Sequence, residues 1–235
     1  MFVKDYEFRY GDLDESGNIK AGTILDILQD AAICHSNSVG YDSEKLKSIN
    51  IAWLLEGWRV KFISPLHNRS KVTVKTGIMT LKACESNRGY EVWQDGECKV
   101  IATADWFTVN TEKMRITRIP DECITAFDRV DEPDNGLPFE RFKPEAGMDI
   151  IDRRNVEKRD LDTNHHMNNV KSAEIAINYI PENFINISEL IIRYRKELKN
   201  SEEFDVFTKT IDGGICVELR NSAGESCVMV KVKEE

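Results

Sequence analysis

The sequence predicts an α+β fold made of two similar halves, each with one central helix wrapped by an antiparallel β-sheet. The same order of elements occurs twice along the 235 residues: a strand, a polar turn, a buried helix and a run of strands. Clusters of turn-forming residues separate the strands of each run, as in antiparallel sheets. A helix next to such strands buries its apolar stripe best against one face of their sheet.

The elements of the first half are set by alternation, helical spacing and turn chemistry. Residues 3–9 alternate as in a strand, and a turn rich in Gly and Asp follows over residues 11–17. From Thr23 the apolar residues recur at helical spacing, and we expect Gly40 to end this helix. The strand patterns that follow cover residues 52–62, 71–81, 89–94 and 99–109. Together these elements predict an N-terminal domain over residues 1–127.

The second half begins after a charged stretch rich in Pro and Gly, residues 128–147, which we interpret as a linker crossing the surface. A C-terminal domain over residues 148–235 is predicted. Pro181 is expected to end its helix. The elements of this domain are, in chain order, a strand over 148–156, a polar turn over 159–169, a helix over 170–180, and strands over 190–198, 204–211, 215–221 and 226–233.

The two halves align with each other, which favours an internal duplication. Residues 12–14 and 160–162 are both Asp-Leu-Asp. Three inserted residues in the second half then place Asn18 on Asn169. Farther along, a constant separation of 134 residues places Ile63 on Glu197.

Composition excludes several classes of function. The net charge of −9 argues against nucleic-acid binding, which needs clustered Lys and Arg. No apolar run approaches the ~18 residues that cross a bilayer, and the start of the chain lacks a signal-peptide core, so we expect a cytoplasmic protein. The six cysteines include no CxxC pair, so we expect reduced thiols and neither a zinc site nor a disulfide framework.

The polar turn over residues 160–169 is the strongest chemical signal. It holds two of the four histidines directly before a helix, whose start stabilises an oxyanion. His166 can move a proton near neutral pH with an acidic neighbour orienting it, and Asn164 can hold a carbonyl or a water. Other interpretations stay open: Asn168 and Asn169 suit helix capping, and a divalent metal site is less favoured because the ligand set is local and incomplete.

The extra polar groups occur in one half alone. The first half has only Glu15 and Ser16 before Gly17, whereas the second has Thr-Asn-His-His-Met in the corresponding turn. Glu197 likewise stands where the first half has Ile63 in a strand of the same kind. As a partner of His166, Glu197 could activate a water molecule. A surface charge is the alternative for Glu197.

These motifs resemble the acyl-acyl carrier protein (acyl-ACP) thioesterases. RDLDTNHHMNNVK followed by YRKEL carries the resemblance, and LQDAAICHS, NIAWLLEGWRVKF and ADWFTVN extend it over nearly the whole chain. The resemblance implies a double hotdog fold, the α+β architecture described above. It also implies hydrolysis without a metal or an organic cofactor, with the catalytic residues Asp162, Asn164, His166 and Glu197.

The resemblance further implies what each of these residues does. Asn164 and the helix amides would hold the thioester carbonyl, while Glu197, His166 and Asp162 would orient and deprotonate water. Many plant members have Cys directly after the Glu, but this chain has Leu198, which favours direct attack by water. Ser172 replaces a Tyr of many relatives, which leaves the packing over the helix start open.

By the same resemblance, the N-terminal domain holds the acyl chain and lacks catalytic residues. Plain core packing is the alternative for each candidate wall residue, and it is also the interpretation of His35. The candidate residues of the acyl-chain walls are Ile24, Leu28, Ala31, Ala32, Trp53, Leu55, Trp58 and Ile78.

The acidic carrier protein requires a basic landing site, and basic residues cluster in sequence around the proposed active site. A solvated face is the alternative for them. The candidate carrier-binding residues are Arg153, Arg154, Lys158, Arg159, Lys171, Arg193, Arg195, Lys196 and Lys199.

The sequence therefore predicts a hydrolase that releases free fatty acid from acyl-ACP and so terminates chain elongation in fatty acid biosynthesis. The partner would be acyl carrier protein with its phosphopantetheine-linked acyl chain, and self-association into a homodimer is left open. The alternatives are an acyl-CoA thioesterase or a hotdog dehydratase, which keep the fold, and a non-catalytic protein that binds acyl thioesters.

Overall fold

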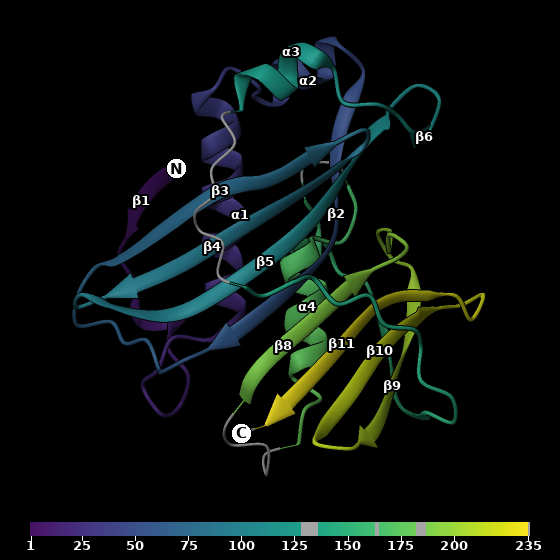
Figure 1. The fold of residues 1–235 in the computed structure, drawn as a ribbon. Helices are drawn as coiled ribbons and strands as arrows, with labels where there is room; N and C mark the ends of the chain where they lie inside the picture. Colours follow the sequence, from purple (N-terminus) through teal and green to yellow (C-terminus); the bar gives the residue numbers. More distant parts are fainter. Residues whose placement is uncertain (128–135, 163–164, 182–186, 235) are drawn as a thin grey trace. The chain divides into compact units, whose positions relative to one another are not determined.

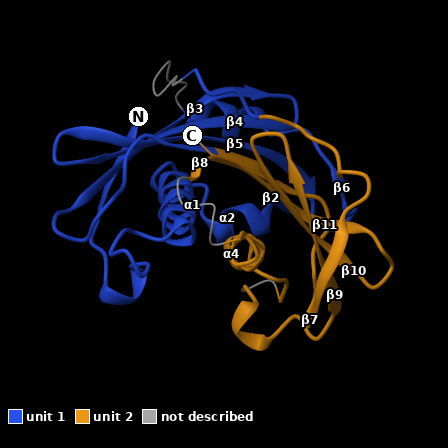
Figure 2. Ribbon diagram, turned by 90° about the horizontal axis from the view of Figure 1, so that it is seen from below, with its two compact units in different colours: residues 1–56, 60–139 blue, residues 57–59, 140–235 orange. Residues whose placement is uncertain are grey.

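The computed structural model describes residues 1–127, 136–162, 165–181 and 187–234. The chain divides into two compact units, which Figure 2 colours separately. Unit 1 comprises residues 1–56 and 60–139, and unit 2 comprises residues 57–59 and 140–235. The predicted domain limits of 1–127 and 148–235 stay a prediction.

Unit 1 is a mainly antiparallel sheet with a long helix, α1 (Ala21–Ser38), against it (Figure 1). The helix buries Ile24, Leu28 and Ala31, and it ends just before Gly40, which has a φ of +83°. That conformation suits glycine, so the predicted helix end is confirmed. The strands are β1 (Phe2–Tyr6), β2 (Ile51–Phe62), β3 (Val72–Lys82), β4 (Glu85–Gln94), β5 (Glu97–Asn110) and β6 (Arg115–Ile116).

The strand order of unit 1 is β1-β3-β4-β5-β2, with β6 beside β5. The sequence patterns missed a 3₁₀ turn, η1 (Tyr10–Asp12), and two short helices, α2 (Ser43–Ser48) and α3 (Asp121–Ala126). The first strand is also shorter than predicted, because the chain leaves the sheet after Tyr6 to form η1.

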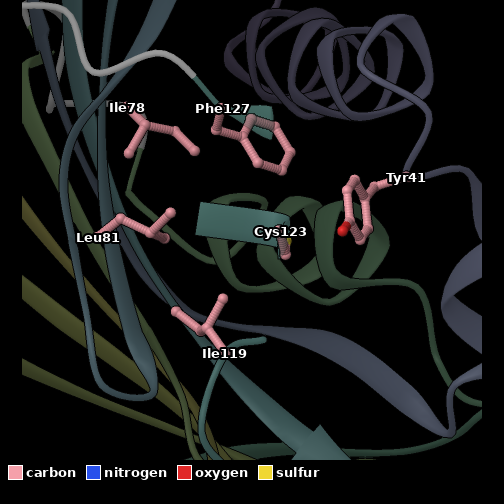
Figure 3. Packing of buried hydrophobic residues seen from close by; sticks show 6 residues of the cluster. All are labelled: Tyr41, Ile78, Leu81, Ile119, Cys123 and Phe127. Atoms are coloured by element: carbon pink, nitrogen blue, oxygen red, sulfur yellow. The ribbon is translucent and has the colours of Figure 1, made fainter. Parts of the chain in front are cut away.

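One part of the core of unit 1 gathers residues from β3, from α3 and from the segments next to α1 and α3. Their side chains point toward one another in Figure 3. Both short helices therefore cover the end of a packed apolar cluster, although each is too short to show periodicity. The buried members of this cluster are Tyr41, Ile78, Leu81, Ile119, Cys123 and Phe127.

Unit 2 repeats the arrangement with fewer residues. Its helix is α4 (Asn169–Ile177), preceded by the 3₁₀ turn η2 (Lys158–Asp160), and the strand order is β8-β11-β10-β9-β7. The strands are β7 (Asp149–Asn155), β8 (Ile187–Tyr194), β9 (Glu203–Ile211), β10 (Gly214–Asn221) and β11 (Ser226–Glu234). The helix ends at Ile177, so Ile180 lies beyond it, contrary to the predicted helix.

The two faces of the unit 2 sheet are covered differently. Val217 and Val230 are opposite each other in the register of β10 and β11, and both are buried on the face that α4 covers. On the other face, the segment Glu140–Met148 crosses the strands. Arg193 of β8 donates to the backbone oxygen of Phe142 at 2.8 Å, and Lys233 of β11 lies 3.5 Å from the Glu140 carboxylate.

Strand β8 ends earlier than the sequence predicted. It stops at Tyr194, so Glu197 and Leu198 lie after the strand and not within it. The backbone N–H groups of Arg195 and Lys196 both donate to the oxygen of Cys227, which ends the ladder there. All six cysteines are free thiols. Within the described residues, the helices are all too short or too polar to cross a membrane.

Candidate active site

The polar turn of unit 2 starts from a 3₁₀ turn whose ends are tied together. The Asp160 side chain accepts from the backbone N–H of Glu157 at 2.9 Å, and its own backbone oxygen accepts from Asn168 at 2.8 Å. Asp160 is buried, so its carboxylate spans the turn and is not presented to a substrate. Asp160 is therefore a structural residue of this site.

The next residues form a tight loop closed by Asp162. Its backbone N–H donates to the oxygen of His166 at 2.8 Å, and its carboxylate accepts from the backbone N–H of His166 at 3.1 Å. His165 lies between them with a φ of +63°, a left-handed conformation that few side chains adopt. Asp162 thus fixes the main chain of His166. Residues 163 and 164 lie outside the described residues, so the predicted place of Asn164 is not described.

The loop is attached to the segment that follows β8. The backbone N–H of Met167 donates to the oxygen of Leu198 at 2.8 Å, and His166 forms a bridge with Lys199. This attachment brings Nε2 of His166 to 3.3 Å from Oε2 of Glu197. The side chains are 31% and 49% exposed, so water reaches both. The predicted pairing of His166 with Glu197 is present in unit 2.

The start of α4 is capped by the side chain of Asn168. The amide oxygen of Asn168 accepts from the backbone N–H groups of Val170 at 2.8 Å and Lys171 at 3.3 Å. The capping interpretation of Asn168 is confirmed, whereas Asn169 is the first residue of the helix. These two helix amides therefore already have an acceptor in Asn168, and the expectation that the helix amides hold the thioester carbonyl stays a prediction.

Tyr194 is a residue of this site that the sequence analysis missed. Its hydroxyl donates to the backbone oxygen of Asn169 at 3.0 Å, and burial raises the pKa of the phenol. The Ser172 hydroxyl donates to the same oxygen at 2.8 Å, which answers how this position packs over the helix start. Alternation along β8 could have placed Tyr194 on the face that α4 covers.

The turn of unit 2 has a counterpart in unit 1 with the same hydrogen bonds. Asp14 donates its N–H to the oxygen of Asn18 at 2.8 Å and accepts from the N–H of Asn18 at 2.9 Å. Gly17 has a φ of +79°, as His165 has +63°. The two turns are therefore equal in length. The predicted three-residue insertion is wrong, and Asn18 corresponds to His166 and not to Asn169.

The counterpart of Glu197 also changes. In unit 1 the N–H groups of Ile63 and Ser64 donate to the oxygen of Lys99, just as Arg195 and Lys196 donate to Cys227. Counting onward places Pro65 at the position of Glu197, so the predicted match with Ile63 is wrong. The prediction that the acidic group occurs in one copy alone does not depend on this register.

The candidate acyl-chain residues are buried in most cases. Six of them lie in unit 1 and are at most 7% exposed, while Trp53 is half-buried against the apolar cluster of Figure 3. Trp58 is fully buried in β2 and belongs to residues 57–59, which group with unit 2; its predicted place in the acyl-chain wall stays a prediction. The six residues are Ile24, Leu28, Ala31, Ala32, Leu55 and Ile78.

The candidate carrier-binding residues fall into three groups. Arg153, Arg159, Lys171 and Lys196 each form an ion pair with an acidic residue of unit 2. Arg193 donates into the segment that crosses the sheet, and Arg154 is half-buried near Tyr179. Lys158, Arg195 and Lys199 are exposed, and none of them has an acidic side-chain partner within the described part of the chain.

Comparison with protein families decides the class. The model of the acyl-ACP thioesterase N-terminal domain matches residues 1–127, and that of the C-terminal domain matches residues 146–233. The chain belongs to the acyl-ACP thioesterase family. The predicted resemblance and the double hotdog fold are confirmed.

Relatives of this thioesterase family occur in plants and bacteria. Oleoyl-acyl carrier protein thioesterase 2 of Arabidopsis thaliana is 21% identical over 79% of this chain. The match covers 56% of that protein, so the chain spans a little over half the length of this relative.

Two solved structures have the same fold. The acyl-ACP thioesterase of Bacteroides thetaiotaomicron matches 99% of this chain and 97% of its own, with a TM-score of 0.91 and 19% identity. The 12:0-ACP thioesterase of Umbellularia californica matches 100% of this chain and 96% of its own, with a TM-score of 0.86 and 19% identity.

Proposed function

We propose that this chain hydrolyses the thioester of acyl-ACP and releases a free fatty acid. The observation that carries the proposal is the 3.3 Å contact between His166 and Glu197 on a solvent-accessible turn, in a chain of the acyl-ACP thioesterase family. A carboxylate beside an imidazole is an arrangement that can take a proton from water.

The proposed reaction needs only water and the substrate. Water adds to the thioester carbonyl carbon while its proton passes to the His166–Glu197 pair. The carbon–sulfur bond then breaks, and the proton goes to the departing sulfur, which leaves as the pantetheine thiol. Asp162 acts on the main chain. Its carboxylate accepts from the backbone N–H of His166 and so fixes the position of the backbone that carries the imidazole.

Direct attack by water is proposed because the residue after Glu197 cannot form an acyl-enzyme. Leu198 has no nucleophilic atom, and its side chain is only 2% exposed. The cysteines among the described residues of unit 2 are Cys216 and Cys227. Both are buried, and burial raises the pKa of each thiol to about 11. Protonated, buried thiols are poor nucleophiles.

Acyl carrier protein is the proposed partner. An acidic carrier would be drawn to the exposed basic side chains that form no ion pair among the described residues, namely Lys158, Arg195 and Lys199. The ion-paired residues contribute less, because their charge is already balanced locally. The predicted cytoplasmic location and the homodimer remain predictions.

The decisive experiment incubates the purified chain with acyl-ACP and acyl-CoA of several chain lengths and measures thiol release. Faster hydrolysis of acyl-ACP at equal concentration supports the proposal. Three results would reject the proposal: preference for acyl-CoA, formation of an enoyl product, or tight binding without turnover. Each would favour one of the alternative functions.

A further inference from the structure

A buried arginine lies in the layer between α1 and the sheet of unit 1. Arg88 of β4 is 5% exposed. In the register of β3 and β4 it is opposite Ile78, one of the candidate acyl-chain residues, and in that of β4 and β5 it is opposite Ala104. Directly opposite residues share a face of a sheet, so the guanidinium lies on the same side as Ile78.

The helix-facing position of Arg88 follows from its partner on α1. Nη1 of Arg88 is 2.8 Å from Nδ1 of His35, and a longer contact of 3.4 Å reaches the Thr76 hydroxyl. Burial, and next to it the charge of Arg88, lowers the pKa of His35 to about 4. The imidazole is therefore neutral at pH 7, and Nδ1 accepts the hydrogen bond.

Both contacts use Nη1, so the Nε and Nη2 donors of the guanidinium have no acceptor among the described residues. An arginine carries five N–H donors and keeps its charge in proteins. Among the residues that the structure describes, no carboxylate forms an ion pair with Arg88. A buried charge without a counter-charge is strongly unfavourable, and desolvation lowers the pKa of Arg88 accordingly. A ligand oxygen would relieve this cost.

We infer that Arg88 selects an acyl chain that carries an oxygen acceptor, a carboxylate or a hydroxyl, on its part remote from the thioester. The inference rests on the proposed function and on the expectation from the family resemblance that the N-terminal domain holds the acyl chain. The proposed function assigns the reacting carbonyl to His166 and Glu197, so any part of the acyl chain held beside Arg88 is a part remote from the thioester. An unsubstituted alkyl end would offer the guanidinium no acceptor beyond His35 and Thr76, whereas an oxygen would accept from it.

The first test compares three acyl-ACP substrates of one chain length: unsubstituted, ω-hydroxylated and ω-carboxylated. We expect kcat/KM to be about tenfold or more higher for the oxygenated substrates, the effect of one hydrogen bond to a charged group. A higher value for the carboxylate than for the hydroxyl identifies charge pairing, and equal values identify hydrogen bonding alone. Preference for the unsubstituted chain overturns the inference.

The variant Arg88→Met removes the charge and keeps a long side chain. It should lose the preference for oxygenated chains while its kcat/KM for the unsubstituted substrate stays the same or rises. Arg118→Met, an exposed arginine of the same unit, is the matched control and should keep the preference. If Arg88→Met lowers all substrates equally, the residue is structural and the inference is wrong. Arg88→Lys, which keeps a cation, covers the case in which Arg88→Met does not fold, and it should retain part of the preference.

A binding measurement separates this inference from the proposed function. Calorimetry with dodecanedioic and dodecanoic acid needs no hydrolysis. Tighter binding of the diacid by the wild-type chain, lost in Arg88→Met, supports the role of Arg88 even if no thioester is hydrolysed. Equal binding of the two acids by the wild type contradicts it, whatever the hydrolysis assay gives.

Discussion

Asn18 and His166 occupy the same position in two copies of one turn. In each copy an aspartate four residues earlier holds the backbone of this position. The N–H of Asn18 donates to the Asp14 carboxylate at 2.9 Å, and the N–H of His166 donates to the Asp162 carboxylate at 3.1 Å. Asn therefore fits this backbone position, and the imidazole is not needed to form the turn. The two copies provide matched controls for one another.

Replacing His166 by the residue of the other copy tests the proposed active site. His166→Asn should keep the turn and the thermal midpoint, yet reduce hydrolysis of acyl-ACP by about 10²–10⁴-fold, the usual contribution of a general acid or base. His165→Gly, which copies Gly17, is the control and should stay active. Near-wild-type rates for His166→Asn would remove this residue from the mechanism.

The two aspartates should separate a structural from a catalytic contribution. Asp14→Ala loses the hydrogen bonds from the backbone N–H groups of Ser16 and Asn18, and Asp162→Ala loses that from His166. We expect each substitution to lower the free energy of unfolding by about 1–2 kcal/mol. Only Asp162→Ala should also reduce hydrolysis, because it releases the main chain of His166. Chemical denaturation and initial rates measure the two effects. Equal losses of activity in both variants would contradict the assignment.

Leu198→Cys tests attack by water. Because the Leu198 side chain is buried, we expect the smaller Cys to cost about 1–2 kcal/mol of stability and to change the rate little. Mass spectrometry of the protein during turnover should detect no added acyl group. A large gain in rate with a trapped acyl-enzyme would show that a thiol here can take over the reaction.

Stability should fall between pH 6.5 and pH 4 because of His35. The pKa of His35 is lowered from 6.5 to about 4 in the folded chain, so the unfolded chain binds more protons in that range. The loss on going from the higher to the lower pH amounts to roughly 2–3 kcal/mol at about 1.4 kcal/mol per pKa unit.

The groups around His35 allow a clean control. Arg88 and the N-terminal amine lower its pKa, and the rings of Phe2 and Phe127 pack on it. His35→Gln keeps an acceptor for Arg88 and does not titrate. Urea unfolding at several pH values should therefore give a flatter profile for this variant. The same slope in both proteins would assign the pH effect to other groups.

Docking of the carrier should depend on unpaired charge. Arg195→Ala and Lys199→Ala should raise KM for acyl-ACP by roughly two- to tenfold at low salt, with less difference at high salt. Arg153→Ala removes an arginine that already pairs with Asp205, so we expect a smaller change. An equal effect of all three substitutions would argue against a local docking site.

The regular elements could be predicted from the sequence, because in a long segment the spacing of the apolar residues indicates which face of the helix or strand is buried. The helix from Thr23 to Gly40 and the strands after it needed no tertiary information. The pairing of His166 with Glu197 was predicted as well, although its register was wrong. Aligning the two halves by residue identity placed Glu197 on Ile63. Aligning them by the equivalent backbone hydrogen bonds to Lys99 and Cys227 places Glu197 on Pro65.

Other features depend on contacts that no local pattern carries. Asn168 was recognisable as a helix cap, but its use of two helix amides follows only from the geometry of the turn. Arg88 stands in a strand pattern like any surface arginine. Its burial results from the packing of α1 against the sheet of unit 1, which brings His35 to its guanidinium.

The segment Glu140–Met148 has a consequence for self-assembly. It lies across the face of the unit 2 sheet opposite α4, held by Arg193 at Phe142, by Lys209 at Ala146 and by Lys233 at Glu140. A second molecule could pack its own sheet on this face only if the segment Glu140–Met148 first moved away from it. Any dimer of the intact protein must therefore be built on edges or on other surfaces, and back-to-back association of these sheets is blocked.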